Sequence, residues 1–396
     1  MRKFLLALLC VAALATPAQA DPKFEAFIQS LWPRVKAAGF SRDLFDAAFK
    51  GITDPDPTVI KLANNQPEFK STTSEYLDKT VTPIRIDTGK AMLSQNADLL
   101  NAIQTKYEVD KKILVGIWGV ESNYGKDMGS MSVMRSLATL MYYGNKKQYA
   151  REQLIAAFTI LKRGIKSPDN FTGSWAAALG HTQFIPTTYL ASAVDWTGDG
   201  KKDIWGSKED ALASTAHYLS QNGWKGDRPW GWEAKLPDGF NRALIGRSTW
   251  KTTAEWEQMG IKPAIGAHFS APSAKAFVMI PQGIDGPVFL VTQNFLALLA
   301  YNYSHGYALA VAMLGDRMGG GPPVQAAWPP QTTDLTFKER VEMQERLTRM
   351  GFDTSGADGR FGAKTYEAVL GFQKKVGMAL DGFPTRKVLE RLRQGG

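Results

Sequence analysis

The chain has 396 residues, enough for about two or three domains, and its 44% hydrophobic and 21% charged residues are typical of folded rather than disordered proteins. Its formal net charge of +9 fits an anionic partner, which could be nucleic acid, a membrane surface or an acidic cell-wall polymer, or simply a soluble basic surface. The single cysteine is Cys10, so a chain that loses it has neither a disulfide nor a thiol nucleophile.

The first twenty residues have the pattern of a secretory signal peptide. Two basic residues precede an apolar stretch over residues 4–14, and small residues lead up to Ala20. We expect cleavage after Ala20, which removes Cys10 and leaves a net charge of +7. Lipid attachment at Cys10 is the less favoured interpretation, because Leu9 is bulky where lipoprotein signals carry a small residue. No later apolar run reaches the roughly 20 residues of a membrane span. We therefore predict an exported, soluble protein, which argues against nucleic acid as the partner.

Helical periodicity dominates the chain up to residue 222 and returns at residues 293–318. Apolar residues recur at three- and four-residue spacing over residues 24–52, and the pattern returns in later segments. Those segments are residues 87–107, 110–120, 148–164, 209–222 and 293–318. Residues 224–287 differ, because they are rich in Gly, Pro and Trp and contain short β-branched or apolar runs. We predict a mainly α (α+β) fold with a small, partly β subdomain at 224–287.

Residues 319–333 are predicted to be a linker, because they contain three glycines, four prolines and no charge. The linker separates a large unit at 21–318 from a module at 334–396. That module has about sixty residues, which is small but sufficient to fold alone.

Glu121 ends an almost wholly apolar helical segment and is followed by a predicted helix stop at residues 122–125. A carboxylate there faces the negative end of the helix dipole, and its apolar neighbours penalise the charged form. Both effects are expected to raise its pKa, as a general acid near neutral pH requires. The alternative is an exposed glutamate at a helix end, because a perturbed carboxylate marks a site only statistically.

Other catalytic chemistries fit the sequence poorly. The four histidines, His181, His217, His268 and His305, are far apart, and there is no serine-hydrolase elbow or phosphate loop. Two segments, at residues 173–189 and 294–311, instead place tyrosines and amides among small or aliphatic residues. Such residues are either buried polar groups with partners or the lining of a sugar-binding groove.

The stretches GVESNYG, ALGHTQFIPTTY and YNYSHGYALAV, in this order and spacing, resemble the lytic murein transglycosylase B family of bacterial cell-wall enzymes. The resemblance covers residues 24–318. It implies a lysozyme-like, mainly helical catalytic domain that cleaves peptidoglycan between MurNAc and GlcNAc. Glu121 matches the family's single catalytic acid/base. The positions that match substrate-binding or active-site residues are Ser174, Gln183, Tyr218, Tyr301, Asn302 and Tyr307.

The family's chemistry also explains why one carboxylate suffices. Glu121 would protonate the glycosidic oxygen, the MurNAc acetamido group would assist, and Glu121 would then take a proton from the C6 hydroxyl. The product is a 1,6-anhydro end, formed without consuming water. Ordinary glycosidases use two carboxylates. A hydrolytic muramidase would therefore need a second one, such as Asp127 or Asp195. A non-catalytic peptidoglycan-binding scaffold with the same groove is the other alternative.

Residues 195–210 contain an EF-hand-like pattern with Gly200 at position 6. The candidate calcium ligands are Asp195, Thr197, Asp199, the carbonyl of Lys201 and, closing a longer loop, Glu209 or Asp210. Position 12 is Gly206, where the pattern calls for a glutamate. A structural calcium ion and a metal-free Asp-Gly turn both remain open, and no cofactor is required for the reaction.

The module at 334–396 resembles the common peptidoglycan-binding domain, a three-helix fold. The resemblance rests on VEMQERLTRMGF, ADGRFGAKTYEAVLGFQKKVGMALDG and the final RKVLERL, although DGFPTRKVL departs from the usual glycine-rich second turn. We therefore expect a periplasmic monomer whose partner is the peptidoglycan glycan strand, with cell-wall synthesis or remodelling proteins as further candidates.

Overall fold

The computed structural model describes residues 21–63, 72–144, 147–283, 285–329, 335–359, 361 and 363–395. The predicted signal peptide at 1–20 and the end of the predicted linker, residues 330–333, lie outside the described residues. Helices dominate, and the main β element is a five-stranded sheet, so the predicted mainly α (α+β) fold is confirmed. Within these ranges, no helix combines the length and hydropathy needed to cross a membrane.

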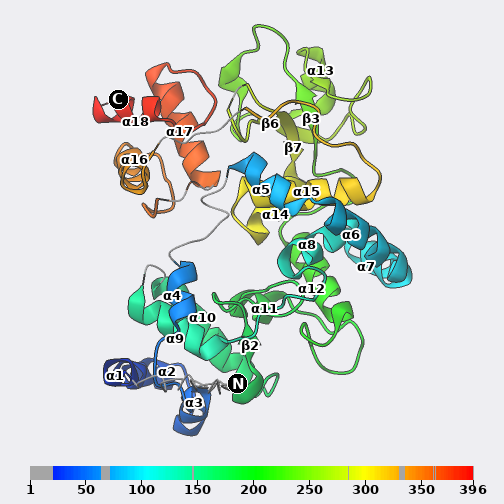
Figure 1. The fold of residues 1–396 in the computed structure, drawn as a ribbon. Coiled ribbons are helices and arrows are strands. Elements are labelled where there is room, and N and C mark those ends of the chain that lie inside the picture. Colours follow the sequence, from blue (N-terminus) through cyan, green and yellow to red (C-terminus); the bar gives the residue numbers. More distant parts are fainter. Residues whose placement is uncertain are drawn as a thin grey trace, which may run out of the picture.

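The first layer of helices has its own core at the bottom of Figure 1. Its helices are α1 (Pro22–Ser30), α2 (Trp32–Ala37), α3 (Arg42–Phe49), α4 (Pro57–Ala63), α9 (Val133–Tyr143), α10 (Lys147–Lys162) and α11 (Pro186–Ser192). The segment predicted as one helical region at 24–52 is divided, because Ser41 caps α3 by accepting a hydrogen bond from the Leu44 amide at 3.3 Å. Phe45 and Phe158 are fully buried between these helices.

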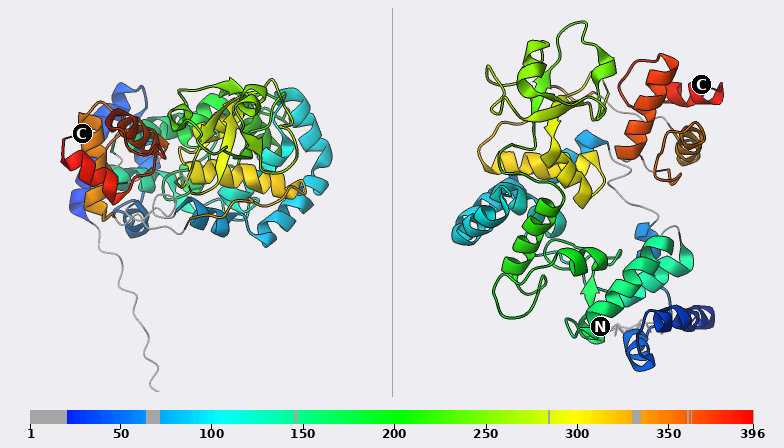
Figure 2. Two further views of the ribbon diagram at one scale, coloured as in Figure 1. Left: turned by 90° about the horizontal axis from the view of Figure 1, so that it is seen from above. Right: turned by 180° about the vertical axis from the view of Figure 1, so that it is seen from behind.

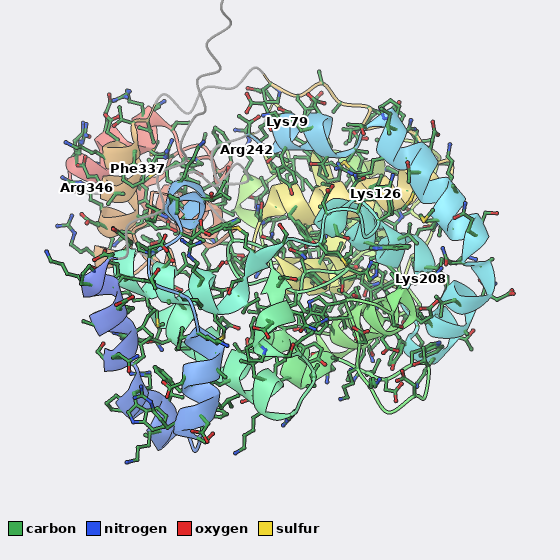
Figure 3. All side chains as sticks on the ribbon, turned by 60° about the horizontal axis from the view of Figure 1, so that its bottom comes forward. Lys79, Lys126, Lys208, Arg242, Phe337 and Arg346 are labelled. Atoms are coloured by element: carbon green, nitrogen blue, oxygen red, sulfur yellow. The ribbon has the colours of Figure 1, made fainter. Side chains whose placement is uncertain are left out.

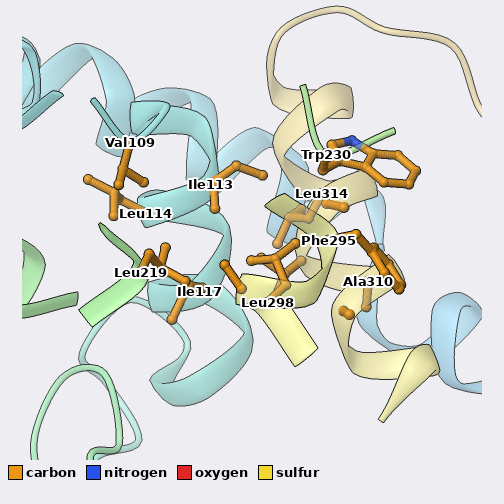
Figure 4. Packing of buried hydrophobic residues seen from close by; sticks show 14 of the residues in the cluster. Val109, Ile113, Leu114, Ile117, Leu219, Trp230, Phe295, Leu298, Ala310 and Leu314 are labelled. Carbon is orange, nitrogen blue, oxygen red and sulfur yellow. The ribbon is translucent and has the colours of Figure 1, made fainter. Parts of the chain in front are cut away.

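The central layer is built around α8 (Lys111–Ser122), most of which is buried. The helices packed against it are α6 (Pro83–Gln95), α7 (Ala97–Tyr107), α12 (Lys208–Gln221) and α15 (His305–Met318). Helices α5 (Thr73–Thr80) and α14 (Gln293–Tyr301) pack in turn against α15. Figure 4 shows how Ile113 and Ile117 of α8 meet Leu219, Leu298 and Leu314 in one apolar cluster. This burial explains the unbroken apolar run before Glu121, because a helix enclosed on all sides needs no polar face.

The sheet lies beyond the central layer, at the top of Figure 1. Its strand order is β4-β6-β7-β3-β5, and all neighbours are antiparallel. The strands are β3 (Gly231–Lys235), β4 (Lys251–Thr252), β5 (Lys262–Pro263), β6 (Lys275–Met279) and β7 (Val288–Thr292), with α13 (Thr253–Gln258) on one face. Phe277 and Val291 face the helices, while Val278 and Leu290 face Trp256 of α13. The sheet runs to Thr292, past the predicted limit of 287, because β7 is its middle strand.

The C-terminal module is a separate three-helix unit with α16 (Phe337–Arg349), α17 (Ala363–Val376) and α18 (Arg386–Arg393) around its own core. Phe337 and Arg346 both lie on α16 (Figure 3). The module sits beside the sheet, as Figure 2 shows from behind. Arg247 and Glu367 form a 2.8 Å salt bridge between the two units.

The described part of the predicted linker is held against the sheet. Both carboxylate oxygens of Glu233 on β3 accept hydrogen bonds from the Gln325 amide, at 3.0 and 2.8 Å, and one also accepts from the Ala326 amide at 2.7 Å. This part of the chain is therefore an ordered strap rather than a free tether.

Candidate active site

Helices α8 and α15 cross closely because each has a glycine at the contact. A Cβ on Gly116 would lie 2.9 Å from the carbonyl oxygen of Val311, and one on Gly315 would lie 3.3 Å from Ile113. The two helices are antiparallel, since residues later in α8 meet residues earlier in α15. Continuing this register to the end of α8 places Glu121 against the first turn of α15.

Tyr307 of α15 meets Glu121 at this point. Its hydroxyl donates a hydrogen bond to Glu121 Oε1 at 2.5 Å. Tyr307 is 1% exposed, and burial followed by the nearby Glu121 charge raises the pKa of its hydroxyl well above the usual value. Tyr307 therefore remains a protonated donor. Glu121 is half-buried, at the end of a helix that is otherwise mostly buried.

Two further tyrosines continue from Tyr307 as a ladder of rings. Tyr301 stacks on Tyr307 with ring centroids 6.4 Å apart, and Tyr218 meets Tyr301 edge-on at 5.2 Å. Their hydroxyls donate to backbone carbonyls, Tyr301 to Thr182 at 2.6 Å and Tyr218 to Ala300 at 2.7 Å. The structure thus brings together three of the predicted tyrosines, and their hydroxyls fix segments from three separate parts of the chain.

The turn after Glu121 is fixed by an unusual backbone. Asn123, Tyr124 and Gly125 have successive φ angles of 50°, 61° and 85°, in the left-handed region that L side chains seldom adopt. Ser122 secures the turn, because its hydroxyl donates to the His181 carbonyl at 2.5 Å and accepts from the Gly125 amide at 2.9 Å. The predicted helix stop is present, and Lys126 just beyond it is exposed (Figure 3).

The sequence did not single out His181, which the fold places against this turn. A Cβ on Gly125 would lie 2.4 Å from His181 Nδ1, so only glycine fits there. Burial lowers the pKa of His181, and its neutral ring accepts a hydrogen bond from Trp118 Nε1 at 3.2 Å. In the sequence, His181 appeared only within the motif ALGHTQFIPTTY and as one of four scattered histidines.

Gln183 and Ser174 hold loops beside the site. Gln183 has a φ of 54°, and its amide nitrogen donates to the Met128 and Gly180 carbonyls at 3.0 and 2.8 Å. Ser174 follows β2 (Thr172–Gly173), which pairs with β1 (Met131–Ser132), and its hydroxyl oxygen accepts from the Ala178 amide at 3.0 Å. Both side chains therefore have structural contacts in addition to any ligand they bind. Asn302 follows α14 as its C-cap residue and is half-buried.

The two aspartates considered as a second carboxylate are both engaged elsewhere. Asp127 is exposed, and one of its oxygens accepts from the Asn123 side chain at 3.3 Å. Asp195 lies in the loop between α11 and α12, where its oxygens accept from the Gly198 and Gly200 amides at 2.7 and 2.8 Å. Asp195 is thus held by its own loop, whereas Asp127 remains exposed on the turn that follows Glu121.

The predicted calcium loop is closed by backbone hydrogen bonds to Asp210. This buried carboxylate accepts from the amides of Trp196 at 2.9 Å, Thr197 at 3.3 Å and Asp203 at 2.9 Å. In the described part of the chain, no three His, Cys, Asp or Glu side chains are arranged to hold a metal ion. The donor set of Asp195, Thr197, Asp199, Lys201 and Asp210 therefore does not fit the predicted calcium ion, because Asp210 already binds three N–H groups and Gly206 offers no carboxylate.

We expect calcium and chelators to leave the melting temperature unchanged. In contrast, Asp210→Asn should lower the free energy of unfolding by about 1–3 kcal/mol, since it strands buried amide donors. Asp199→Asn is the matched control, because Asp199 is exposed and accepts one loop amide, that of Lys201. Thermal unfolding with calcium and with chelator measures all three effects. A calcium-dependent rise that Asp199→Asn removes would contradict the metal-free loop.

Comparison with known proteins identifies both units. Residues 23–316 match the family model described as the transglycosylase SLT domain, and residues 338–392 match a peptidoglycan binding domain. The membrane-bound lytic murein transglycosylase B of Escherichia coli (strain K12) is 30% identical over 312 residues, covering 74% of this chain and 82% of that protein. SltB3 from Pseudomonas aeruginosa, solved with NAG-anhNAM-pentapeptide, is 43% identical with a TM-score of 0.82, over 93% of this chain and 99% of that one.

A more distant structure bears on the metal question. The Escherichia coli lytic transglycosylase Slt35, solved in complex with calcium, is 28% identical with a TM-score of 0.60, over 75% of this chain and 93% of that one. The calcium complex is a property of that protein; in this chain position 12 of the loop is Gly206, and Asp210 accepts three backbone amides.

Proposed function

The chain belongs to the SLT-domain family of lytic transglycosylases, and we propose that it cleaves the β-1,4 bond between MurNAc and GlcNAc without water. The reaction leaves 1,6-anhydroMurNAc ends. The observation that supports this proposal is the half-buried carboxylate of Glu121, which accepts a hydrogen bond from the buried Tyr307 hydroxyl at 2.5 Å. One such carboxylate is enough for an intramolecular reaction, in which the sugar supplies its own nucleophile.

Glu121 has two oxygens with different roles in this proposal. Because Tyr307 binds Oε1, we assign proton transfer to Oε2. Protonated Glu121 gives its proton to the glycosidic oxygen as the bond to the MurNAc anomeric carbon breaks, with the acetamido group assisting at that carbon. The carboxylate then takes the proton of the C6 hydroxyl as that oxygen bonds to the anomeric carbon. The carboxyl group ends in the state in which it began, and the Tyr307 hydrogen bond stabilises its charged form in between.

The remaining site residues are proposed to hold the glycan. Tyr301 and Tyr218 are half-buried next to the Tyr307 ring, and aromatic rings suit contacts with sugar rings. The side chains of Asn302, Gln183 and Ser174 supply amide and hydroxyl groups for the sugar substituents. Since Gln183 and Ser174 also hold loops, their loss would loosen the site as well as weaken binding.

The domain organisation follows the same proposal. Residues 21–318 form the catalytic domain, with the sheet as a subdomain beside it, and residues 334–396 bind peptidoglycan. Residues 319–333 join them. A signal peptide at 1–20 would direct the protein to the periplasm, where it acts as a monomer on glycan strands, alone or with cell-wall synthesis and remodelling proteins.

Product analysis tests the proposed reaction. The mature protein is incubated with purified peptidoglycan, and the released muropeptides are identified by mass spectrometry. We expect muropeptides one water lighter than their reducing counterparts. Reducing ends would instead establish hydrolysis and overturn the proposal. Binding to sacculi without any release would establish a scaffold.

A further inference from the structure

A cavity of about 500 Å³ lies between the end of α10 and the loop after α11, outside the catalytic site. Its charged lining residues are Arg163, Lys166, Lys201, Lys202 and Asp203. Four cations therefore surround one carboxylate. Part of the lining is less polar, since the buried Tyr189 and the half-buried Ile165 also belong to it.

The four cations are not neutralised by the protein. None of them forms a salt bridge with a residue of the described ranges, whereas Arg135 pairs with Asp54 and Asp56. Lys166 only lies over the Trp205 ring, 4.7 Å from its centroid. The carboxylate of Asp203 is occupied, because it accepts from the Trp205 and Gly206 amides at 3.1 and 3.0 Å. Like charges gathered around a cavity repel one another, and a bound anion would relieve that repulsion.

The pocket is also ordered. The Tyr189 hydroxyl donates to the Lys202 carbonyl at 2.7 Å, and the Tyr189 ring packs on Trp205 at 5.4 Å. Asp210 fixes the same loop through the Asp203 amide. Arg163, just after α10, can be explained by the negative end of the helix dipole alone. The helix dipole does not explain Lys201 and Lys202, because these residues lie on a loop.

We propose that this pocket binds the carboxylates of a peptidoglycan stem peptide, as a second anchoring site separate from Glu121. The inference rests on the proposed function, because the substrate of that reaction carries anionic peptides along its glycan strands. A lining that combines separate side-chain cations with the less polar Tyr189 and Ile165 suits a peptide, whose carboxylates alternate with less polar groups. Phosphate sites more often use backbone N–H groups at helix N-termini or in nests. The loop at residues 195–210, whose sequence resembled a calcium site, thus borders a proposed binding site for anions.

Binding of the free stem pentapeptide tests the pocket directly. Arg163→Gln/Lys202→Gln removes two of its charges and leaves the Lys202 carbonyl that Tyr189 needs. Lys235→Gln/Lys262→Gln is the matched control, because it removes two exposed charges from the distant β3–β5 pair. Titrations use full-length mature protein carrying Glu121→Gln, so that cleavage plays no part. We expect the pocket variant to bind about 3- to 10-fold more weakly, and the control to bind like the parent.

Titrations with other ligands identify the group that the pocket binds. Pentapeptide with amidated carboxylates should not distinguish the pocket variant from the control. Equal pentapeptide affinity in both variants would overturn the proposal. Weakened binding of inorganic phosphate with unchanged pentapeptide binding would also overturn it, in favour of a phosphate ligand. Failure of the proposed function would be recognised separately. The protein with Glu121 intact would then release no anhydro products, whatever the titrations show.

Discussion

Glu121→Gln should reduce the release of anhydro-muropeptides by at least about 10²- to 10⁴-fold, the usual contribution of positioned proton transfer. Glutamine has the same shape and keeps an oxygen for the Tyr307 hydroxyl, so the fold should persist. It can neither protonate the glycosidic oxygen nor take the C6 hydroxyl proton. The rate of product release from purified peptidoglycan measures the effect, while pull-down with sacculi should show binding equal to the parent.

Asp127→Asn is the matched control for this experiment. Asp127 lies on the turn that follows Glu121 and is exposed. In a lytic mechanism with one carboxylate, this variant should cleave at a rate close to that of the parent. Loss of activity in both variants would indicate a pair of carboxylates and therefore hydrolysis. Unchanged turnover in Glu121→Gln would remove the assignment of the acid/base altogether.

Tyr307→Phe should lower kcat/KM by about 10- to 100-fold, because a hydrogen bond to a charged group contributes about 1.5–3 kcal/mol. The lost bond stabilised the carboxylate and not the protonated acid. The acid form therefore persists to higher pH, and the alkaline limb of the kcat/KM profile should move upward. Rates of anhydro-product release across pH measure both the loss and the shift.

Tyr301→Phe provides the comparison. Its hydroxyl binds the Thr182 carbonyl rather than Glu121, although its ring occupies the same ladder. This variant can lose activity through a displaced loop, but the alkaline limb should remain where it is in the parent. The same upward shift in both variants would show that the tyrosines act through general packing and not through the Tyr307 hydrogen bond.

The short distance between Glu121 and Tyr307 depends on residues that carry no chemistry. Replacement of Gly116 by a larger residue would push α15 away, since even a Cβ would come within 2.9 Å of the Val311 carbonyl. Gly125 has a similar role at the turn, where the His181 ring occupies the space of a side chain. The glycines of the first motif are therefore part of the site's geometry.

Local features were determined by the sequence alone. Helical periodicity, the separate C-terminal module and the helix stop after Glu121 all depend on residues close to one another in the chain. They are correctly predicted because spacing and backbone preference act locally. The identity of the candidate site residues came from matching motifs, which name residues without giving their contacts.

The tertiary structure decided which of these residues meet. The register of α8 against α15 pairs Glu121 with Tyr307, and periodicity cannot specify such a register because it depends on packing between distant segments. The same limit explains why the sequence named His181 only as one of four scattered histidines and did not place it against the turn after Glu121. It also explains why the sequence of the loop at residues 195–210 resembled a cation site, although folding places the loop beside cations. Arg163 and Lys166 come from a different part of the chain, and only folding places their charges beside Lys201 and Lys202 around one cavity.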